Sequence, residues 1–590
     1  MLRTFGILAG LLFAVQAIAA DWPQFRGLGG SATSDSKIPV SWTPTENVAW
    51  KFKMPGPGVS SPIVVGNKVI VTCYSGYGVD RQNVGEIKNL MRHVICVDAK
   101  SGEKLWQADI EAVQPEDPYT GAGVPAHGYA SHTPVSDGKN VYVFFGKTGA
   151  LAFDLNGKQL WHTQLGKETD PMRWGSSSSP ILYKDVLIVT ASAESQSIVG
   201  LDTKTGKEIW KQEAKRLDNT WATPAIASGG GRDDLVVAVP GEVWGLDPMT
   251  GKLRWYSESA GGDQASTSPV ISNGVIYTVA GGRSGGGTAA IKVGGSGDTT
   301  QSAKVWTSRD SSRFPSPIGY KSNLYLIAND TVTILNESNG EKVKQVRLQG
   351  GSGRGGGMGG DYPSPVIAGN YMYVLKGSGE TFVFNLAGEL EQVSINLVTA
   401  DSESFGGTPA ISDGRMFLRS DKHLYCVSQM TDVKPNASEA LLAKLGEGAG
   451  GGGGRGGPGG GGGRGGPGGG PGGGRGGPGG PGGGGGFDPA AIFGRLDANS
   501  DGKVTKEELQ NSPMADRFAE LDKNKDSSLS QEEFMEAMRA MMAQGGGPGG
   551  GPGGGRGGPG GPGGGGGFGG GFGGRGGGAD KPSRPDRPGT

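Results

Sequence analysis

Two acidic loops in the last quarter of the chain contain the residues best suited to chemistry. In the first loop, oxygen ligands stand at alternate positions and a glutamate stands at the twelfth; the ligand positions are Asp497, Asn499, Asp501, Lys503, Thr505 and Glu508. Lys503 would contribute its backbone carbonyl, and Gly502 permits the sharp turn at the sixth position. Oxygen ligands at this spacing suit a hard divalent cation, so the loop is predicted to bind Ca²⁺.

A second loop with the same spacing follows, and its ligand positions are Asp522, Asn524, Asp526, Ser528, Ser530 and Glu533. Ser527 stands at the sixth position, where glycine is preferred, so we expect this loop to be strained and to bind more weakly. Both loops fit the EF-hand pattern, which predicts flanking helices and a paired calcium-binding module over residues 487–544. Val504 and Leu529, at the eighth position of their loops, are expected to pair.

An internal repeat organises the chain before these loops. A Ser/Thr-Pro pair followed by apolar residues occurs eight times, with prolines at Pro62, Pro134, Pro180, Pro224, Pro269, Pro317, Pro365 and Pro409. The first interval is 72 residues and the others are 44 to 48. Each pair leads into two alternating apolar runs with a tight turn between them, which predicts two strands. Proline fits the first residue of a strand, where a missing N–H matters least.

A second signature ends the earlier repeats, and it consists of an Asp, a Gly three or four residues later, and a Trp four residues after the Gly. It occurs at Asp98-Gly102-Trp106, Asp154-Gly157-Trp161, Asp202-Gly206-Trp210 and Asp247-Gly251-Trp255. Asp can bond the turn backbone and Gly accepts positive φ, so the signature predicts a hairpin. The Trp would begin an outer strand and bury its surface between repeats. Four short strands per period of about 45 residues match a propeller blade.

We therefore predict a mainly β fold, an eight-bladed β-propeller over residues 21–430, rather than a β-sandwich with accidental spacing. The eighth repeat, from Thr408 to Val427, stops before any Trp strand. Trp50 stands in a strand that no repeat precedes, so it is expected to complete blade eight and remove the open sheet edges. The long first interval is assigned to an insertion at about Ser75–Arg92.

If the propeller has a site, the site should lie at its central opening. The segments just before each Ser/Thr-Pro pair converge on one face, because each connects an outer strand to the next inner strand. The candidate ligand- or cofactor-binding residues are His127, Tyr129, Trp174, Trp221, Phe314, Tyr362 and Phe405. Their polar neighbours are Arg173, Asn219, Asp263, Gln264, Arg313, Asp361 and Glu403. This mixture predicts a binding funnel; alternatively, the aromatic residues wedge between blades.

The histidines and cysteines indicate no catalytic residue. His127 and His132 are close enough for a zinc site to be considered, but no cysteine or further histidine joins them locally, and no nucleophile-elbow pattern accompanies them. Three cysteines are too few for a disulfide scaffold. Cys73 and Cys96 fall on neighbouring predicted strands, so they could pair or remain buried free thiols.

Composition and the first residues bear on location and partners. A formal net charge of −1 gives no electrostatic case for a nucleic-acid partner. Residues 1–20 resemble a cleaved signal peptide without a lipid-anchor cysteine, so we expect a periplasmic or secreted protein with no membrane anchor. Residues 446–486 and the tail 545–590 are rich in Gly and are predicted to be disordered.

The Asp-x-x-Thr-Gly-x-x-x-Trp pattern at Asp202 and Asp247 resembles the repeat of pyrroloquinoline-quinone (PQQ)-type propellers. The opening Asp21-Trp-Pro-Gln-Phe-Arg-Gly is similar to the start of the secreted BamB-like members of that superfamily. The resemblance covers roughly residues 21–430 and implies the fold more than the function, because the repeat is a packing motif.

The resemblance implies two functions. One is a PQQ-dependent quinoprotein dehydrogenase that oxidises an alcohol or sugar; many such enzymes carry a disulfide between adjacent cysteines, whereas no two cysteines here are adjacent. Their calcium ligands and Asp base also have no matching segment. The other is a non-catalytic scaffold that binds a protein or polymer on a propeller face. We favour the scaffold, with Ca²⁺ as the expected ligand of the EF-hands.

Overall fold

The computed structural model describes residues 21–429 apart from Gly29, Ala122, 171–172, 282–284 and 352–361, and beyond them 503–506, Phe518, Asp522, 524–530, 533–534 and 585–589. The predicted signal peptide, the 446–486 linker, most of the first cation-binding loop and most of its flanking helices lie outside the described residues. The chain divides into two compact units: residues 1–452 together with 579–590, and residues 453–578.

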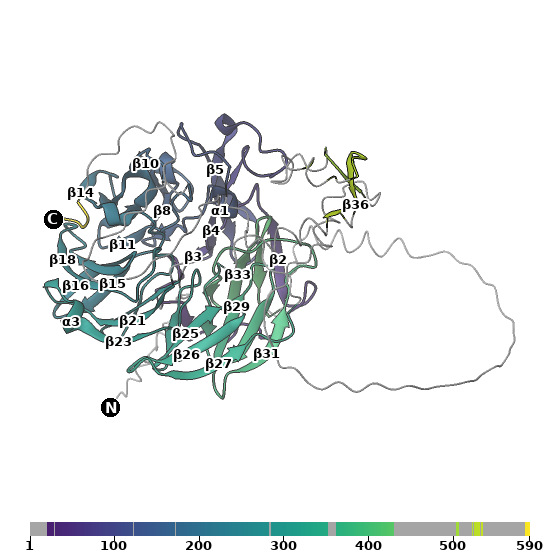
Figure 1. The fold of residues 1–590 in the computed structure, drawn as a ribbon. Coiled ribbons are helices and arrows are strands. Elements are labelled where there is room, and N and C mark those ends of the chain that lie inside the picture. Colours follow the sequence, from purple (N-terminus) through teal and green to yellow (C-terminus); the bar gives the residue numbers. More distant parts are fainter. Residues whose placement is uncertain are drawn as a thin grey trace, which may run out of the picture. The chain divides into compact units, whose positions relative to one another are not determined.

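The first unit is an eight-bladed β-propeller, so the predicted fold is confirmed (Figure 1). Each blade contains a four-stranded antiparallel sheet, and in blades one to seven its strands run outward in chain order. Blades one and two comprise β3 (Ile63–Val65), β4 (Lys68–Ser75), β5 (Met91–Asp98), β6 (Lys104–Glu111), β7 (Val135–Ser136), β8 (Asn140–Phe144), β9 (Ala150–Asp154) and β10 (Gln159–Thr163). Blades three and four comprise β11 (Ile181–Tyr183), β12 (Val186–Ala191), β13 (Ser197–Asp202), β14 (Glu208–Glu213), β15 (Ala225–Gly229), β16 (Arg232–Val239), β17 (Glu242–Leu246) and β18 (Leu253–Glu258).

The second half of the ring repeats this arrangement. Blades five and six comprise β19 (Val270–Ser272), β20 (Val275–Ala280), β21 (Gly287–Lys292), β23 (Lys304–Ser308), β24 (Ile318–Tyr320), β25 (Asn323–Ala328), β26 (Thr331–Asn336) and β27 (Lys342–Arg347). Blades seven and eight comprise β28 (Val366–Ala368), β29 (Tyr371–Leu375), β30 (Thr381–Asn385), β31 (Glu391–Asn396), β32 (Ala410–Ser412), β33 (Arg415–Arg419), β34 (His423–Val427) and β2 (Val48–Lys53).

Short elements decorate the sheets. Two strands pair in parallel with a blade: β1 (Ala32–Thr33) with β28, and β22 (Gly297–Asp298) with β18. The described helices are α1 (Val124–His127), α2 (Ser192–Ser195), α3 (Thr300–Ala303), and the 3₁₀ turns η1 (Ile87–Asn89), η2 (Gly146–Thr148) and η3 (Lys215–Leu217). In the second unit, β35 (Lys503–Thr505) and β36 (Ser528–Ser530) form an antiparallel pair. Val504 lies opposite Leu529 there, which confirms their predicted pairing.

Strand β2 closes the ring as predicted. It pairs antiparallel with β34 and places Trp50 opposite Cys426. The outermost strand of blade eight is therefore supplied by a segment that precedes blade one in the sequence. This pairing joins the two ends of the propeller chain through main-chain hydrogen bonds.

Five of the outer-strand Trp residues pack on the glycine turn of the next blade, whereas the signature Trp255 lies against Gly245 of its own blade. A Cβ added to Gly102 would lie 2.6 Å from the Trp50 indole, and one on Gly206 would lie 2.6 Å from Trp161. The same contact joins Trp106 to Gly157, Trp210 to Gly251 and Trp306 to Gly340. The indole N–H of Trp50 donates to the Ala99 carbonyl at 3.2 Å. Glycine is thus required in these turns for two reasons: the backbone has positive φ, and a side chain would collide with the indole.

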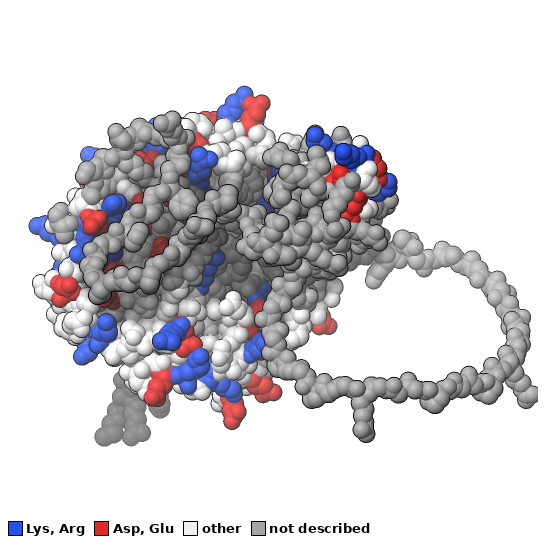
Figure 2. Space-filling model, in the orientation of Figure 1, with Lys and Arg blue, Asp and Glu red and all other residues white. Residues whose placement is uncertain are grey.

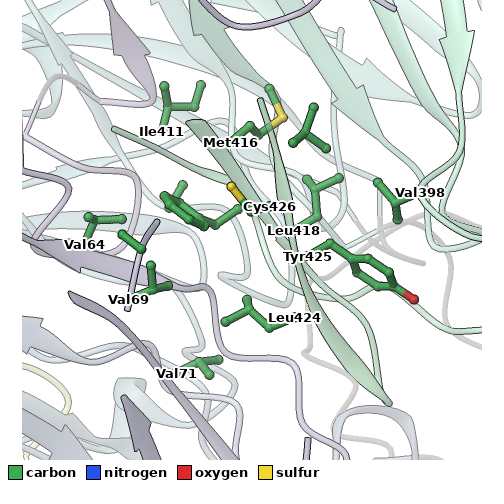
Figure 3. Packing of buried hydrophobic residues seen from close by; sticks show 14 of the residues in the cluster. Val64, Val69, Val71, Val398, Ile411, Met416, Leu418, Leu424, Tyr425 and Cys426 are labelled. Atoms are coloured by element: carbon green, nitrogen blue, oxygen red, sulfur yellow. The ribbon is translucent and has the colours of Figure 1, made fainter. Parts of the chain in front are cut away.

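The hydrophobic cores lie between blades. Figure 3 shows one of them, where Val69 and Val71 of blade one face Leu424 and Cys426 of blade eight. Cys73 belongs to this core, whereas Cys96 belongs to the core between blades one and two. The two thiols lie on neighbouring strands but on opposite faces of the sheet, so they do not pair, and all three cysteines are buried and free.

The long first interval has two sources, and only one was predicted. Residues between β4 and β5 form the expected insertion, which contains η1. A second insertion, residues 112–134, connects β6 to β7 and contains α1. Sequence reasoning missed it because the Pro62–Pro134 spacing reports only the total length of the two insertions.

The visible surface mixes both charge signs. On the face shown in Figure 2, Lys and Arg side chains are interspersed with Asp and Glu. Among the described residues, no helix is long and apolar enough to cross a membrane.

Candidate functional site

The Ser/Thr residues that precede the eight repeat prolines form a closed ring of hydrogen bonds. Each hydroxyl oxygen accepts the backbone N–H of its counterpart in the preceding blade at 2.9–3.0 Å. The members, in order, are Ser61, Thr133, Ser179, Thr223, Ser268, Ser316, Ser364 and Thr408. A hydroxyl is needed because it satisfies a buried N–H that the sheets leave unpaired.

The hydroxyl ring lines a central cavity of about 150 Å³. All eight Ser/Thr residues face it, and further serines such as Ser177 and Ser266 extend the polar wall. The repeat motif therefore produces both the join between blades and a polar lining.

Residues 21–31, of which Gly29 is not described, run from blade one to blade seven past one end of the central cavity. Trp22 exchanges backbone hydrogen bonds with Val64 of blade one, at 3.0 and 2.9 Å. At the far end of this stretch, the Ser31 carbonyl accepts the N–H of Ile367 in blade seven at 2.8 Å. Phe25, between these anchors, lines the cavity. We call this cavity the funnel, the end lined by Phe25 its floor, and the end lined by the candidate aromatic residues its mouth.

The buried guanidinium of Arg26 fixes this stretch in place. It donates to the Ser31 hydroxyl at 2.8 Å and to the carbonyl of Pro317 in blade six. Burial lowers the pKa of Arg26 to about 10, so the side chain stays charged at neutral pH. Gly27 has positive φ, and a Cβ there would lie 2.8 Å from the Trp22 indole. These contacts explain the Trp-Pro-Gln-Phe-Arg-Gly opening as a plug.

Five of the seven candidate residues lie around the cavity. The lining includes His127, Trp174, Trp221, Phe314 and Tyr362. Trp174 and Trp221 meet edge to face with ring centroids 6.2 Å apart, and Phe314 and Tyr362 are 4.6 Å apart. These five side chains are half-buried, so part of each ring faces the opening. We call Trp174, Trp221, Phe314 and Tyr362 the aromatic rim.

Two candidates lie elsewhere. Tyr129 is buried in the core between blades one and two, edge to face with Tyr74 at 5.3 Å. Phe405 is buried beside Gly379 of blade seven and stacks on Tyr425 of blade eight, with ring centroids 6.2 Å apart. The alternative considered from sequence, aromatic residues wedged between blades, therefore describes these two residues.

The polar candidates divide in the same way. Gln264 and Arg313 line the cavity, and the Arg313 guanidinium lies 4.8 Å from the Phe314 ring centroid. Glu403 is buried and accepts hydrogen bonds from Ser420, His423 and Tyr425. The exposed Arg173 and Asp263 and the half-buried Asn219 are not among the described lining residues, and Asp361 lies outside the described residues.

His127 is held by both ring nitrogens. Its Nε2–H donates to the Trp174 carbonyl at 2.5 Å, which leaves Nδ1 to accept the Ser131 hydroxyl at 2.6 Å. Burial lowers the pKa of His127, although the bond to the carbonyl opposes this. A neutral imidazole with both nitrogens occupied positions the Trp174 backbone and is a poor metal ligand. No cluster of three or more His, Cys, Asp or Glu suited to a metal occurs among the described residues.

A smaller pocket of about 30 Å³ adjoins the funnel through His127 and Ser131, and it contains buried charge. There, the Ser176 hydroxyl donates to Glu194 at 2.5 Å and lies 3.1 Å from His132 Nε2. Burial raises the pKa of Glu194 to about 7 and lowers that of His132 to about 3.

The order of these three residues does not suit hydrolysis. A hydrolytic triad needs the carboxylate on the second nitrogen of the histidine, where it orients the ring. Here the carboxylate bonds the serine, and His132 Nδ1 has no partner among the described residues. Two buried ion pairs, Arg92–Glu116 and Lys147–Asp117, lie at the same pocket. We interpret the buried polar groups here as a structural network.

The described cavity lining does not fit PQQ. A quinone with three carboxylates needs several cationic partners, and a calcium ion beside it needs carboxylate ligands. The described lining includes one cation, Arg313, and neither Asp nor Glu.

The second predicted calcium loop folds around the carboxylate oxygens of its predicted ligands. Asp522 accepts backbone N–H bonds from Asp526 at 3.2 Å and from Ser527 at 2.9 Å. Glu533 accepts the N–H of Ser530 at 3.0 Å, and this hydrogen bond keeps the pKa of Glu533 low. Ser527 has φ of 67°, the left-handed conformation for which glycine is preferred. Carboxylate oxygens at these positions and the sharp turn fit a calcium loop.

Sequence reasoning missed Phe25, Ser176 and Glu194. Phe25 lies in the Asp21–Gly27 opening motif, whose resemblance to a family does not indicate that it lines the cavity. Ser176 and Glu194 belong to no repeat position, so only the fold brings them together.

Comparison with known proteins agrees with this architecture. Residues 90–346 match the family model described as "Outer membrane protein assembly factor BamB", and residues 490–511 match the EF hand model. The second match includes the first predicted calcium loop and is compatible with Ca²⁺ binding. No curated protein matches the chain.

Three solved structures show distant likeness. BamB from Moraxella catarrhalis is 16% identical, with a TM-score of 0.45, over 65% of this chain and 97% of that chain. Saccharomyces cerevisiae Sqt1 is 9% identical, with a TM-score of 0.45, over 64% and 98%. The quinohemoprotein alcohol dehydrogenase from Comamonas testosteroni is 11% identical, with a TM-score of 0.33, over 69% and 80%. At this level of similarity, none of them bears on what this chain binds.

Proposed function

We propose that this chain, a PQQ-type-repeat, BamB-like β-propeller with an EF-hand segment, is an exported, calcium-binding scaffold that is not an enzyme. Its funnel binds an extended segment of a partner protein at the aromatic rim. The observation that supports this most is the lining of the funnel, which combines Phe25 and the four side chains of the aromatic rim with the ring of hydroxyl groups. Concave sites with aromatic walls and a few polar groups are typical binding sites.

The rim and the wall suit different parts of a peptide. The Trp174–Trp221 and Phe314–Tyr362 pairs offer flat apolar surfaces for a side chain. The hydroxyl groups of the polar wall can bond a main-chain amide. Arg313 would add one positive charge, which favours an acidic residue in the partner.

The catalytic alternative has less support. The described lining does not fit PQQ, and the Glu194–Ser176–His132 chain lacks the geometry of a hydrolytic triad. A role in binding needs only the rim and the wall.

The test is selection of peptides from a random extended-peptide library by the full chain, followed by affinity measurement. Trp174→Ala and Trp221→Ala should each weaken the selected peptides by about 30-fold, the loss expected for a hot-spot aromatic. Trp174→Phe should retain most of the affinity. Val343→Ala, which alters an exposed apolar residue on an outer strand, is the matched control and should change nothing.

Three results would overturn the proposal. One is that no selected peptide distinguishes the wild type from the rim variants. Another is that the rim variants lose binding to a polysaccharide panel instead, which would assign the funnel to a polymer. The third is stoichiometric binding of PQQ with dye reduction in the presence of an alcohol or sugar.

A further inference from the structure

Residues 585–589 lie against the edge of the propeller, far in sequence from the strands that they contact. The segment belongs to the same compact unit as the blades. Its backbone accepts two hydrogen bonds from η3: Lys215 N–H donates to the Pro585 carbonyl at 2.8 Å, and Arg216 N–H donates to the Asp586 carbonyl at 3.4 Å. Figure 1 shows the segment in yellow beside β14 and β18.

Arg587 anchors the segment on blade four. Its guanidinium donates twice to the Glu242 carboxylate, from Nε at 2.8 Å and from Nη2 at 2.6 Å. It also lies 3.7 Å from the ring centroid of Tyr256, within cation–π range. A two-pronged bond to a carboxylate combined with stacking on an aromatic ring is specific to arginine, because a lysine offers neither the fork nor the flat surface.

The Glu242 carboxylate lies at the centre of the surface that the segment contacts, which we call the groove. The Glu242 side chain is 7% exposed and also accepts the indole N–H of Trp244 at 2.8 Å. Arg216 approaches the same carboxylate at 3.4 Å. The neighbouring Pro588 is buried, so the segment contributes an apolar contact beside the ionic one. Backbone bonds, a forked ion pair, stacking and a buried proline thus coincide over four consecutive residues.

We propose that this groove, formed by η3, Glu242 and Tyr256, is a peptide-binding site for an Asp-Arg-Pro sequence and that its occupant is the chain's own residues 585–588. The segment then acts as a latch. The cation-binding loops lie in the sequence between the last propeller strand and this latch, so that stretch is attached to the propeller at both of its ends.

Attachment within one chain makes a modest contact sufficient. A tethered peptide experiences an effective concentration of the order of 1 mM. An intrinsic dissociation constant of about 0.1 mM would then keep the latch about nine-tenths closed. Two backbone amides report its closure directly, because the N–H groups of Lys215 and Arg216 donate to the segment.

The experiment is hydrogen exchange of the full chain, with the exchange of the Lys215 and Arg216 amides as the readout. Arg587→Ala should speed their exchange about tenfold, the factor that corresponds to a latch nine-tenths closed. Arg587→Lys should restore only part of the protection, because it keeps the charge but loses the fork. Arg584→Ala removes the same charge from the other Arg-Pro pair of the tail and should leave both amides protected.

A Glu242→Gln variant tests the other side of the contact and should match Arg587→Ala. Equal acceleration by Arg584→Ala and Arg587→Ala would show non-specific charge attraction and overturn the site. Protection that falls on tenfold dilution of the protein would make a second copy the occupant and overturn the latch. The Trp174→Ala variant should not alter these amides, so failure of the funnel and failure of the latch are distinguishable.

Discussion

The Ser61 hydroxyl accepts the backbone N–H of Thr408 at 2.9 Å, and this bond joins the eighth blade to the first at the centre of the propeller. The other blades are joined by the equivalent bond, between the Ser/Thr residues that precede their repeat prolines. The outer strands show the same equivalence, because the Trp50 indole covers Gly102 of blade one as Trp106, Trp161, Trp210 and Trp306 cover the glycines of their next blades. The closure between blades eight and one therefore uses the contacts found elsewhere in the ring.

The hydroxyl ring is predicted to be a source of stability. Thr223→Val keeps the shape of the side chain but leaves the Ser179 N–H, now bonded to Thr223 at 3.0 Å, without a partner. A buried unpaired N–H costs about 1–3 kcal/mol, so urea denaturation should show a loss of that size. Thr223→Ser keeps the hydroxyl and is the control. Equal losses in both variants would mean that the methyl group, and not the bond, matters.

Tryptophans of the core and of the rim should respond differently to truncation. Trp255 is fully buried, and its indole N–H donates to Asp234 at 2.8 Å. Trp255→Ala should cost about 3–5 kcal/mol in the free energy of unfolding, because it leaves a cavity and removes one hydrogen bond from the buried Asp234 carboxylate, which keeps its ion pairs with Arg232 and Arg254. Trp174→Ala, at the half-buried rim, should cost about 1 kcal/mol or less. Similar losses measured by urea denaturation would assign Trp174 to packing.

Glu194 should make stability depend on pH. Burial raises the pKa of Glu194 from 4.5 to about 7, so between these values the folded chain holds a proton that the unfolded chain releases. This group's contribution is complete below about pH 4.5 and is lost as pH rises towards about 7, with a total change of the order of 3 kcal/mol. Glu194→Gln should remove that slope from denaturation curves recorded between pH 4 and 8. Glu208→Gln, at an exposed position of β14, should keep it.

Calcium binding should depend on the twelfth residue of each loop. Glu508→Gln and Glu533→Gln each remove a predicted bidentate ligand, so calorimetry of the full chain should show one binding event fewer. Because Val504 and Leu529 pair across the loops, loss of one site should also weaken the other. Glu507→Gln and Glu532→Gln alter the adjacent, non-ligand position and serve as controls. The absence of heat with millimolar Ca²⁺ for the wild type would refute calcium binding.

The thiols should be inert in the folded protein. Burial raises the pKa of Cys73 and of Cys96 to about 12, and both side chains are fully buried. A thiol reagent should modify none of the three cysteines until denaturant is added, and then all three. Recovery of only one thiol from the denatured, unreduced protein would show that two of the three cysteines had formed a disulfide.

The fold was largely predictable because its signals are local and repeated. The Ser/Thr-Pro spacing marks the blades, and a Trp strand without a repeat identified Trp50 as the closing piece. The site was predictable only in part. Tyr129 and Trp174 both lie in the segment just before a repeat proline. The second insertion in the first interval carries aromatic partners such as Tyr119, whose ring is 6.3 Å from the Tyr129 ring, and these hold Tyr129 in a core.

Residues that meet through distant parts of the chain could not be found from the sequence. Glu194 and His132 face each other across blades through Ser176, and the Arg587–Glu242 pair spans 345 residues. No periodicity marks such contacts. Their detection requires the geometry of the closed ring.

The plug over the funnel floor has a consequence for the order of folding. Residues 21–35 are synthesised before their partners. Arg26 precedes its hydrogen-bond partner Pro317 by 291 residues, and Asp35 precedes its partner Gly414 by 379 residues. They cannot take their places until blades six to eight exist, so the earliest part of the propeller chain is among the last to settle. A nascent chain halted before blade six should therefore leave the Trp22–Ser31 stretch open to proteases, and completion of the ring should protect it.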